Sequence, residues 1–437
     1  MRRILDRIIG LIAKVIALGF FRRVEVSGRE HIPKRRPVLV VANHFNGFVD
    51  PLLVAATLGR LPRMVAKATL AKFLPARPFL WLAGVVLVQR SQDGEGTGRN
   101  ASAFAACSKV LRRRHTVVIF PEGTTHDRPH LDRLRTGAAR MALEARSGGA
   151  TGLQILPMGL SYPDKLAVRS LALVRIGAAV DLDAELPSIT AAGAEASSDD
   201  HQAVDDLTSE IDRRLRAVAP DFADVEAWLT FERAAQVALR EPGAREPGLA
   251  ERAELAGRLD DAPAELRDAV RTSLAQYVLD LDLSGLDDRH LVTAPNLRSL
   301  VRRALVDGLL VAVALPFVVA GLLCNVAPFV VVNLASMAVR TPVTKGTVRV
   351  LVAAITFPLA WIAGGILVAD GTWRVLLAAL LFAVAGYLTL IAAEAATRLL
   401  RELRALRTVR ERAALVGRLR SRRDEVVSAV EAAGPTS

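Results

Sequence analysis

Short runs of apolar, largely β-branched residues alternate with helix-like patterns from Val24 to about Val180. The runs that predict strands lie at 38–42, 63–67, 85–88, 116–120, 153–157 and 171–176. Patterns with helical spacing lie between several of them, at 52–57, 100–113 and 137–146. This alternation predicts an α/β domain with a mixed or mostly parallel sheet flanked by helices, in which reactive side chains lie in loops at the strand ends.

The first twenty residues form an apolar stretch that Arg7 and Lys14 interrupt. Its large apolar side chains recur at helical spacing, at Ile4, Ile8, Leu11, Val15 and Leu18. Because no small-residue cleavage site follows, we do not expect a signal peptide. We expect residues 1–23 to form an amphipathic helix that lies in a membrane interface, with an ordinary packed helix as the alternative.

Apolar residues dominate 301–397, which we expect to be a helical membrane region. Its first part is long enough to cross a bilayer but contains three residues that interrupt a transmembrane helix, Pro316, Asn325 and Pro328. A re-entrant or tight hairpin is therefore expected there. The alternative for the whole region is a buried helical bundle in a soluble protein.

Two regular apolar stretches of spanning length follow, at 349–369 and 375–393, and both should cross the membrane. Basic residues flank the apolar segments, at Arg302, Arg303, Arg340, Lys345, Arg349, Arg398, Arg401, Arg404 and Arg407. Because basic loops are retained in the cytoplasm, these flanks and the α/β domain are predicted to be cytoplasmic. Residues 398–437 would then form a basic cytoplasmic tail.

The intervening chain, 187–300, is predicted to be a linker and helical connector. A Pro-, Ala- and Ser-rich stretch at 187–200 and the sequence REPGAREPG at 240–248 have the composition of linkers. Apolar residues at helical spacing predict an amphipathic helix between them, at Val204, Leu207, Ile211 and Leu215. The predicted organisation is therefore an interfacial helix (1–23), an α/β domain (24–186), a connector, a membrane region and a tail.

Composition and charge narrow the choice of partners. The 437-residue chain is 51% hydrophobic with a formal net charge of +12, and it carries no zinc-finger, RNP-type or helix-turn-helix signature. Membrane lipids and anionic metabolites are therefore expected partners, and nucleic acid is not. The two cysteines, Cys107 and Cys324, do not suggest a disulfide framework. His126 and His130 are four residues apart, but Pro129 opposes a helix that would align them, so neither a metal site nor a cofactor is expected.

Four short stretches of the α/β region carry polar or turn-forming residues at expected strand ends. NHFNGFVD supplies His44 and Asp50, and GVVLVQR ends on Arg90. FPEGTTHD turns sharply and exposes Glu122, and ILPMGL closes another strand on Pro157. Because a doubly wound sheet gathers strand ends at one edge, these groups are expected to meet there.

Taken in this order, the four stretches resemble the glycerolipid acyltransferase family, which includes the bacterial lysophosphatidate acyltransferases. The resemblance covers residues 24–180. The usual motif has four residues between its His and Asp, whereas five separate His44 from Asp50 here. That spacing, with FVDP, is similar to the subgroup of fungal glycerol-3-phosphate and dihydroxyacetone-phosphate acyltransferases, which also carry C-terminal membrane segments.

The resemblance implies that a fatty acyl group moves from a thioester of coenzyme A or acyl carrier protein to a glycerol hydroxyl. The acceptor would be glycerol-3-phosphate or 1-acylglycerol-3-phosphate, in phosphatidic acid and phospholipid synthesis. An unperturbed imidazole, with a pKa of ~6.5, can remove a hydroxyl proton at neutral pH, so His44 is the expected general base. Asp50 would accept the other ring N–H, fix the tautomer and stabilise the imidazolium, without a covalent acyl-enzyme.

Other residues of the motifs are expected to bind the acceptor. Arg90 offers a fork of donors for its phosphate, and Arg135 offers a second cation at a helix start. Glu122 either holds a glycerol hydroxyl or braces the turn, and its neighbours Gly123 and Thr124 are candidate substrate-binding residues.

Each assignment has a simpler alternative. Asp50 followed by Pro51 is typical of a helix N-cap. Arg90 could instead form a salt bridge with Glu122, and Arg135 could be a solvated surface charge. Two other functions also remain open: a thioesterase or lipase, for which no nucleophile motif is found, and a non-catalytic lipid-binding scaffold. The sequence leaves the oligomeric state open.

Overall fold

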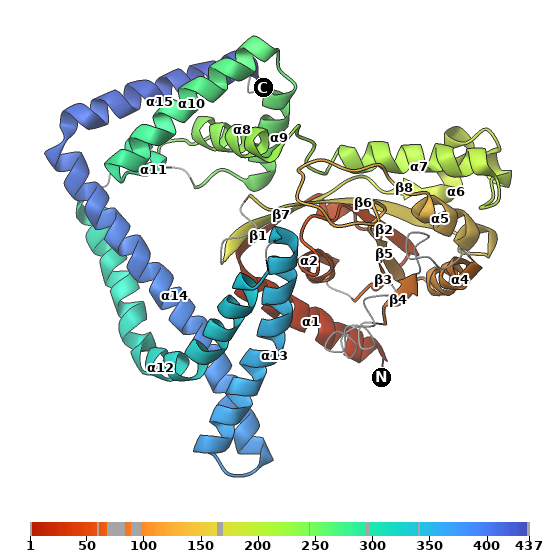
Figure 1. Ribbon diagram of the computed structural model, residues 1–437, viewed down its shortest axis with the longest axis horizontal. Helices are drawn as coiled ribbons and strands as arrows, with labels where there is room; N and C mark the ends of the chain where they lie inside the picture. Colours follow the sequence, from red (N-terminus) through yellow and green to blue (C-terminus); the bar gives the residue numbers. More distant parts are fainter. Residues whose placement is uncertain are drawn as a thin grey trace. The chain divides into compact units, whose positions relative to one another are not determined.

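The computed structural model of the chain describes residues 2–58, 61–67, 84–88, 98–163, 169–243, 245–293, 297–339 and 341–434. The chain divides into two compact units, which we describe separately (Figure 1). The first comprises residues 1–225 with 341–347, and the second comprises 226–340 with 348–437. The α/β unit therefore extends beyond the predicted boundary at residue 186 and includes a short segment from the C-terminal third.

The first unit is built on one sheet. Its strands in the described part of the chain are β1 (Phe21–Ser27), β2 (Val38–Ala42), β3 (Arg63–Lys67), β4 (Val86–Val88), β5 (Thr116–Ile119), β6 (Gln154–Ser161), β7 (Ser170–Ile176) and β8 (Val180–Asp181). Their order is β1-β7-β6-β2-β5-β3-β4, with β8 beside β6. β6 runs antiparallel to β7 and β8 and the other neighbouring pairs are parallel, which confirms the expected mixed, mostly parallel sheet. β1 was not predicted, because Arg22, Arg23 and Glu25 obscure its apolar pattern.

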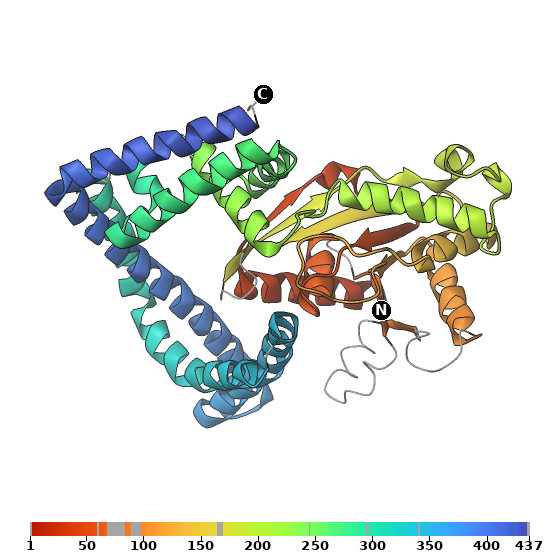
Figure 2. The ribbon, with the colours of Figure 1, turned by 45° about the horizontal axis from the view of Figure 1, so that its top comes forward.

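Helices cover both faces of this sheet (Figures 1 and 2). They are α1 (Arg2–Phe20), α2 (Val49–Leu58), α4 (Gly98–Arg112), α5 (Gly137–Ser147), α6 (Leu182–Ile189) and α7 (His201–Arg216), with short 3₁₀ turns η1 (Arg29–His31) and η5 (Gly193–Glu195). α4, α5, α6 and α7 share one core with alternate strand residues such as Leu39 and Val117. Val38 and Val40 alternate with these residues and are fully buried on the other face, where α1 and α2 pack together.

The stretch 187–200, whose composition predicts a linker, belongs to the packed first unit. Ala196 is buried in the core of the first unit, and the predicted helix after it, α7, packs on the sheet. The apolar stripe of α7 is buried there, at Val204, Leu207, Ile211 and Leu215. Small residues such as Ala and Ser occur both in linkers and in tightly packed connections, so composition alone did not separate the two cases.

The second unit is helical. Its elements are α8 (Val225–Ala238), α9 (Leu249–Asp260), α10 (Ala264–Ser284), α11 (Asp288–Val292), α12 (Leu297–Met337), α13 (Pro342–Val368), α14 (Thr372–Glu411) and α15 (Ala413–Ala433). α15 packs on α10, and Arg423 donates to the buried carboxylate of Asp288 at 3.0 Å. The expected basic tail is therefore largely a packed helix, which buries Val416, Leu419, Val426 and Val430.

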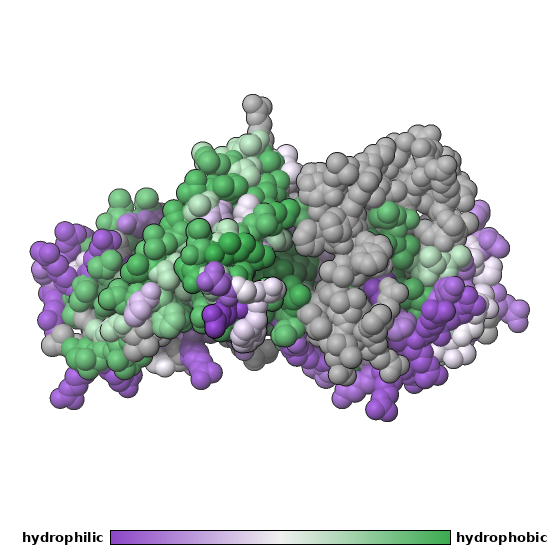
Figure 3. All heavy atoms as spheres, turned by 90° about the horizontal axis from the view of Figure 1, so that it is seen from below, coloured by the Kyte–Doolittle hydropathy of each residue, from purple (hydrophilic) through white to green (hydrophobic). Residues whose placement is uncertain are grey.

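Three helices in the described part of the chain are long and apolar enough to cross a membrane. The candidate spans are Leu315–Met337, Thr344–Val368 and Thr372–Glu411. Their large apolar side chains face outward, as at Leu323 and Leu367, which are 79% and 86% exposed. Figure 3 shows apolar residues gathered on the surface that is seen from below. A soluble protein rarely exposes so large an apolar surface, so these helices indicate membrane association.

The first of these helices covers the segment in which a re-entrant or tight hairpin is expected. α12 is one helix from Leu297 to Met337, and it bends along its length (Figure 1). Pro316 and Pro328 lie inside it, and a proline that removes a helical hydrogen bond is a common cause of such a bend. Asn325 is accommodated because its amide donates to the Gly321 carbonyl at 2.7 Å and accepts from the Trp361 indole at 2.8 Å. The expected re-entrant segment is therefore a bent helix rather than two helices joined by a tight turn.

Candidate active site

The carboxyl ends of three adjacent parallel strands deliver polar residues to one edge of the sheet. β2 lies between β5 and β6, and the three run in the same direction. His44 follows β2, Glu122 follows β5 and Tyr162 follows β6, each within three residues of the strand end. The structure thus brings His44 and Glu122 together, as the strand pattern predicted.

Asp50 contacts the imidazole of His44. The His44 Nδ1 atom lies 2.8 Å from Asp50 Oδ2, and the same oxygen accepts the N–H of Asn46 at 2.7 Å. Gly47, at φ 52°, adopts the left-handed conformation that lets the longer loop bring Asp50 back to the ring. Because an ionised carboxylate only accepts hydrogen bonds, Nδ1 carries the proton in this pair, and Nε2 is left as the basic nitrogen.

The surroundings restrict the His44 ring further. Its side chain is 17% exposed, whereas that of Asp50 is fully buried. The ring stacks on Phe120, with centroids 4.2 Å apart and planes inclined by 19°. A ring held on one face and at one nitrogen has a single orientation, which is what a general base requires.

Asp50 is not a helix N-cap. α2 already begins at Val49, so Asp50 lies within its first turn. The carboxylate accepts from His44, Asn46 and Tyr162, which all lie outside α2. The alternative drawn from the Asp-Pro pair is therefore wrong, because the chain enters the helix one residue earlier than that pair suggests.

Tyr162 is a residue of this site that the sequence analysis missed. Its hydroxyl donates to Asp50 Oδ1 at 2.6 Å, and its ring stacks on Phe21. Burial, together with the charge of Asp50, raises the pKa of Tyr162 well above its ordinary value, so the hydroxyl stays protonated and remains a donor. Its position directly after the strand that contains ILPMGL was the available signal.

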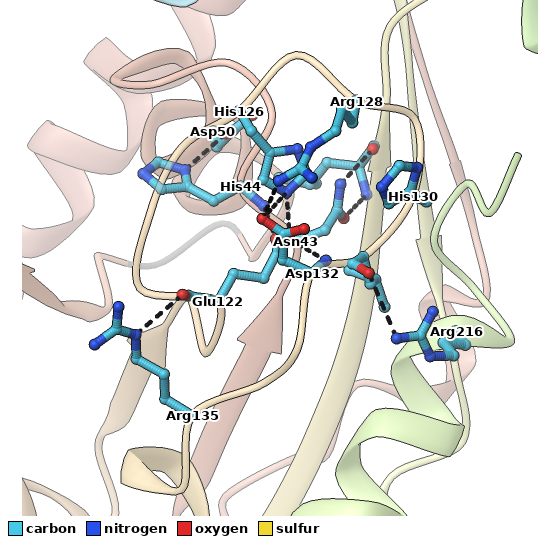
Figure 4. Close-up of polar contacts among 12 residues, drawn as sticks. Asn43, His44, Asp50, Glu122, His126, Arg128, His130, Asp132, Arg135 and Arg216 are labelled. Atoms are coloured by element: carbon cyan, nitrogen blue, oxygen red, sulfur yellow. Dashed lines mark hydrogen bonds and ion pairs between the residues drawn. The ribbon is translucent and has the colours of Figure 1, made fainter. Parts of the chain in front are cut away.

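Both carboxylate oxygens of Glu122 contact neighbouring residues of the site (Figure 4). Its Oε1 atom accepts the backbone N–H of His44 at 2.8 Å. Its Oε2 atom accepts the N–H of Asp132 at 3.0 Å and lies 2.5 Å from Nε2 of His126. The Glu122 side chain is fully buried, so these contacts fix the backbone at His44 and the loop that follows β5.

The other candidate binding residues after β5 have distinct positions. Gly123 has φ 70°, and a Cβ there would lie 2.7 Å from Arg135 Nε, so the position requires glycine. Arg135 is exposed just before α5, and its Nε donates to the Glu122 carbonyl at 3.3 Å (Figure 4). Thr124 is half-buried in the same loop. Arg90 lies outside the described residues.

Asn43 ties the motif loop to the neighbouring strand and was also missed. Its side-chain amide donates to the Leu160 carbonyl at 2.9 Å and accepts the Leu160 N–H at 2.6 Å. Because Leu160 lies two residues before Tyr162, this pair of bonds sets the separation between Tyr162 and the His44 loop.

Three side chains that could together hold a metal ion lie beside the site. One ligand atom each from Glu122, His126 and Asp132 falls within 4.8 Å of the others, although the sequence offered no evident partners for His126. A metal ion bound there would replace the contact between His126 and Glu122. Since Glu122 also accepts two backbone N–H groups, we assign the cluster a bracing role, and the absence of a cofactor stays a prediction.

A match to a known protein family gives the class of this domain. Residues 23–161 match the family described as Acyltransferase, so the first unit contains an acyltransferase-family domain. The match includes His44, Asp50 and Glu122 and ends just before Tyr162.

Particular relatives share this part of the chain. The 1-acyl-sn-glycerol-3-phosphate acyltransferase of Borreliella burgdorferi is 28% identical over 149 residues, which are 34% of this chain and 55% of that protein. Glycerol-3-phosphate O-acyltransferase 2 of Saccharomyces cerevisiae is 28% identical over 136 residues, 31% of this chain and 18% of that protein. The crystal structure of the 1-acyl-sn-glycerophosphate acyltransferase PlsC from Thermotoga maritima is 19% identical, with a TM-score of 0.35 over 48% of this chain and 77% of its own. The chain thus spans about half the length of the first relative and less of the second.

Proposed function

We propose that this protein is a membrane-bound acyltransferase that moves a fatty acyl group from an acyl thioester to a hydroxyl of glycerol-3-phosphate or 1-acylglycerol-3-phosphate. The observation that carries the proposal is the His44–Asp50–Tyr162 arrangement inside an acyltransferase-family domain. The name of the Borreliella burgdorferi relative supports 1-acylglycerol-3-phosphate as acceptor, and that of the Saccharomyces cerevisiae relative supports glycerol-3-phosphate. The product would feed phosphatidic acid and phospholipid synthesis.

In the proposed reaction His44 acts as the general base. Its Nε2 atom takes the proton of the acceptor hydroxyl while that oxygen attacks the thioester carbonyl carbon. The carbonyl electron pair moves to oxygen, then returns as the C–S bond breaks, and the departing thiolate takes the proton from the imidazolium. Asp50 stabilises the imidazolium, and Tyr162 keeps the carboxylate in place.

This route needs no covalent acyl-enzyme. Cys107, the cysteine of the first unit, is fully buried in the core. Burial raises the pKa of its thiol to about 12, so the nucleophilic thiolate does not form near neutral pH. A thioester substrate, either acyl-coenzyme A or acyl carrier protein, would therefore react directly with the activated hydroxyl.

A membrane location suits the substrates. On α1 the large residues Leu11 and Val15 are 62% and 61% exposed, whereas the small residues Ala13 and Ala17 are buried. An exposed apolar stripe on an amphipathic helix is typical of binding in a membrane interface. With the three apolar helices, it supports a membrane enzyme. Its catalytic domain would face the cytoplasm, where both kinds of thioester donor occur.

One assay tests the proposal. The full-length protein, purified in detergent, is given acyl-coenzyme A or acyl carrier protein donors separately, with glycerol-3-phosphate, dihydroxyacetone phosphate or lysophosphatidate as acceptor. We expect an acylated product with at least one acceptor, and none with His44→Ala. Free fatty acid released at the same rate without an acceptor would identify a thioesterase and refute the proposal.

A further inference from the structure

The start of α13 contacts the loop that carries His44. Residues 341–347 belong to the same compact unit as that loop, although the rest of α13 belongs to the other unit. We call residues 341–347 the docking turn. Within it, Thr347 Oγ1 accepts the backbone N–H of Phe48 at 3.2 Å, across 299 positions of the sequence. The beginning of an apolar helix is thus bonded to the catalytic loop.

A second contact in the docking turn is steric. A Cβ on Gly346 would lie 2.5 Å from Asn46 Oδ1 and 3.9 Å from a methyl group of Val49. The helix therefore approaches the loop so closely that a side chain at position 346 would displace the Asn46 amide. Asn46 is 1% exposed, and neither polar atom of its amide has a hydrogen-bond partner in the described part of the structure. Burial of an unpaired amide is unfavourable, so its own hydrogen bonds do not hold this side chain in place.

These contacts lead directly to the catalytic pair. The backbone N–H of Asn46 donates to Asp50 Oδ2, the oxygen that also faces His44 Nδ1. Gly47 has the left-handed backbone conformation, and the next residue, Phe48, donates its backbone N–H to Thr347. The docking turn therefore holds the middle of the loop, and the Asp50 carboxylate joins its two ends.

We propose that Thr347 and Gly346 are positioning residues, which keep the 44–50 loop in the geometry that places Asp50 against the His44 ring. The inference rests on the proposed role of His44 as the base. Because Thr344–Val368 is a candidate span, the turn that supports the loop is also the start of an apolar helix. The first turn of α13 then contributes to turnover.

The test compares substitutions within the docking turn. Thr347→Val keeps the shape of the side chain but removes the acceptor, whereas Thr347→Ser keeps the oxygen. Thr344→Val is the matched control, because the Thr344 hydroxyl is exposed and bonds to Thr341. For each full-length variant we would measure kcat, the acceptor KM, and the hydrogen exchange of residues 45–49 by mass spectrometry.

We expect Thr347→Val to lower kcat about fivefold, the equivalent of one hydrogen bond, with little change in KM. Exchange at 45–49 should also become faster, while Thr347→Ser and Thr344→Val should match the wild type. Gly346→Ala should be more severe, and Asn46→Ala should restore part of its activity by removing the clashing oxygen. A wild-type kcat in Thr347→Val would overturn the inference. An inactive wild type would instead refute the proposed function, and the exchange measurement would still decide whether the docking turn holds the loop.

Discussion

Replacing Asp50 by Asn separates the charge of this residue from its shape. In the structure one oxygen faces His44 Nδ1 and accepts from Asn46, and the other accepts from Tyr162. An asparagine can keep its oxygen toward His44 and Asn46, but its NH₂ group then faces the hydroxyl of Tyr162. The negative charge that stabilises the imidazolium is lost in either orientation.

The magnitudes follow from these contacts. Removing the carboxylate charge from a Ser-His-Asp triad costs about 10⁴-fold in kcat, or about 5 kcal/mol of transition-state stabilisation, and we expect a loss of similar order here. One buried donor left without an acceptor costs about 1–3 kcal/mol of stability, which corresponds to a melting temperature lower by several degrees. Tyr162→Phe removes one hydrogen bond to a charged group, so its kcat should fall by at most about 100-fold.

The assay is steady-state acyl transfer with saturating donor and acceptor, paired with thermal unfolding of each variant. The expected order of kcat is wild type, Tyr162→Phe, Asp50→Asn and then His44→Ala, with each variant folded at the assay temperature. Near wild-type turnover in Asp50→Asn, beside an inactive His44→Ala, would refute the reasoning. Asp50 would then only support the loop, and His44 would act without a carboxylate partner.

Three further predictions concern the neighbouring residues and the membrane region. Glu122→Gln should lower the melting temperature and kcat together and leave the acceptor KM nearly unchanged, because the side chain braces the backbone at His44. A selective rise in the acceptor KM would show that Glu122 binds substrate instead. Arg90→Ala and Arg135→Ala should each raise the acceptor KM more than the donor KM, because a charged contact to the acceptor phosphate is lost. If the acceptor KM is unchanged in both variants, the phosphate binds to other residues. Reporter fusions after Arg303, Arg340 and Arg398 should read cytoplasmic, and one at Gly371 external, since basic residues flank the first three and the bent α12 is expected to return to the side from which it enters. A cytoplasmic signal at Gly371 would contradict this topology.

Much of the α/β domain could be predicted from local pattern. The strands at 38–42 and 116–120 are continuous apolar runs, because both faces of a parallel sheet are buried, and the structure places β2 and β5 there. The order of the four motifs was sufficient to identify the family, and the meeting of His44 and Glu122 followed from the rule that parallel strands end at one edge. Composition was less informative where small residues pack tightly, as at 187–200.

The sequence by itself determined the α/β pattern, the His44 and Asp50 motif and the apolar character of the C-terminal helices, because each is written in neighbouring residues. The tertiary structure alone decided which partners those residues have. Tyr162 lies 112 positions from Asp50 and Thr347 lies 299 positions from Phe48, and no local pattern encodes such a pair. Such contacts exist because the sheet order and the return of the chain at 341–347 bring distant segments together, and packing around buried groups then selects one arrangement.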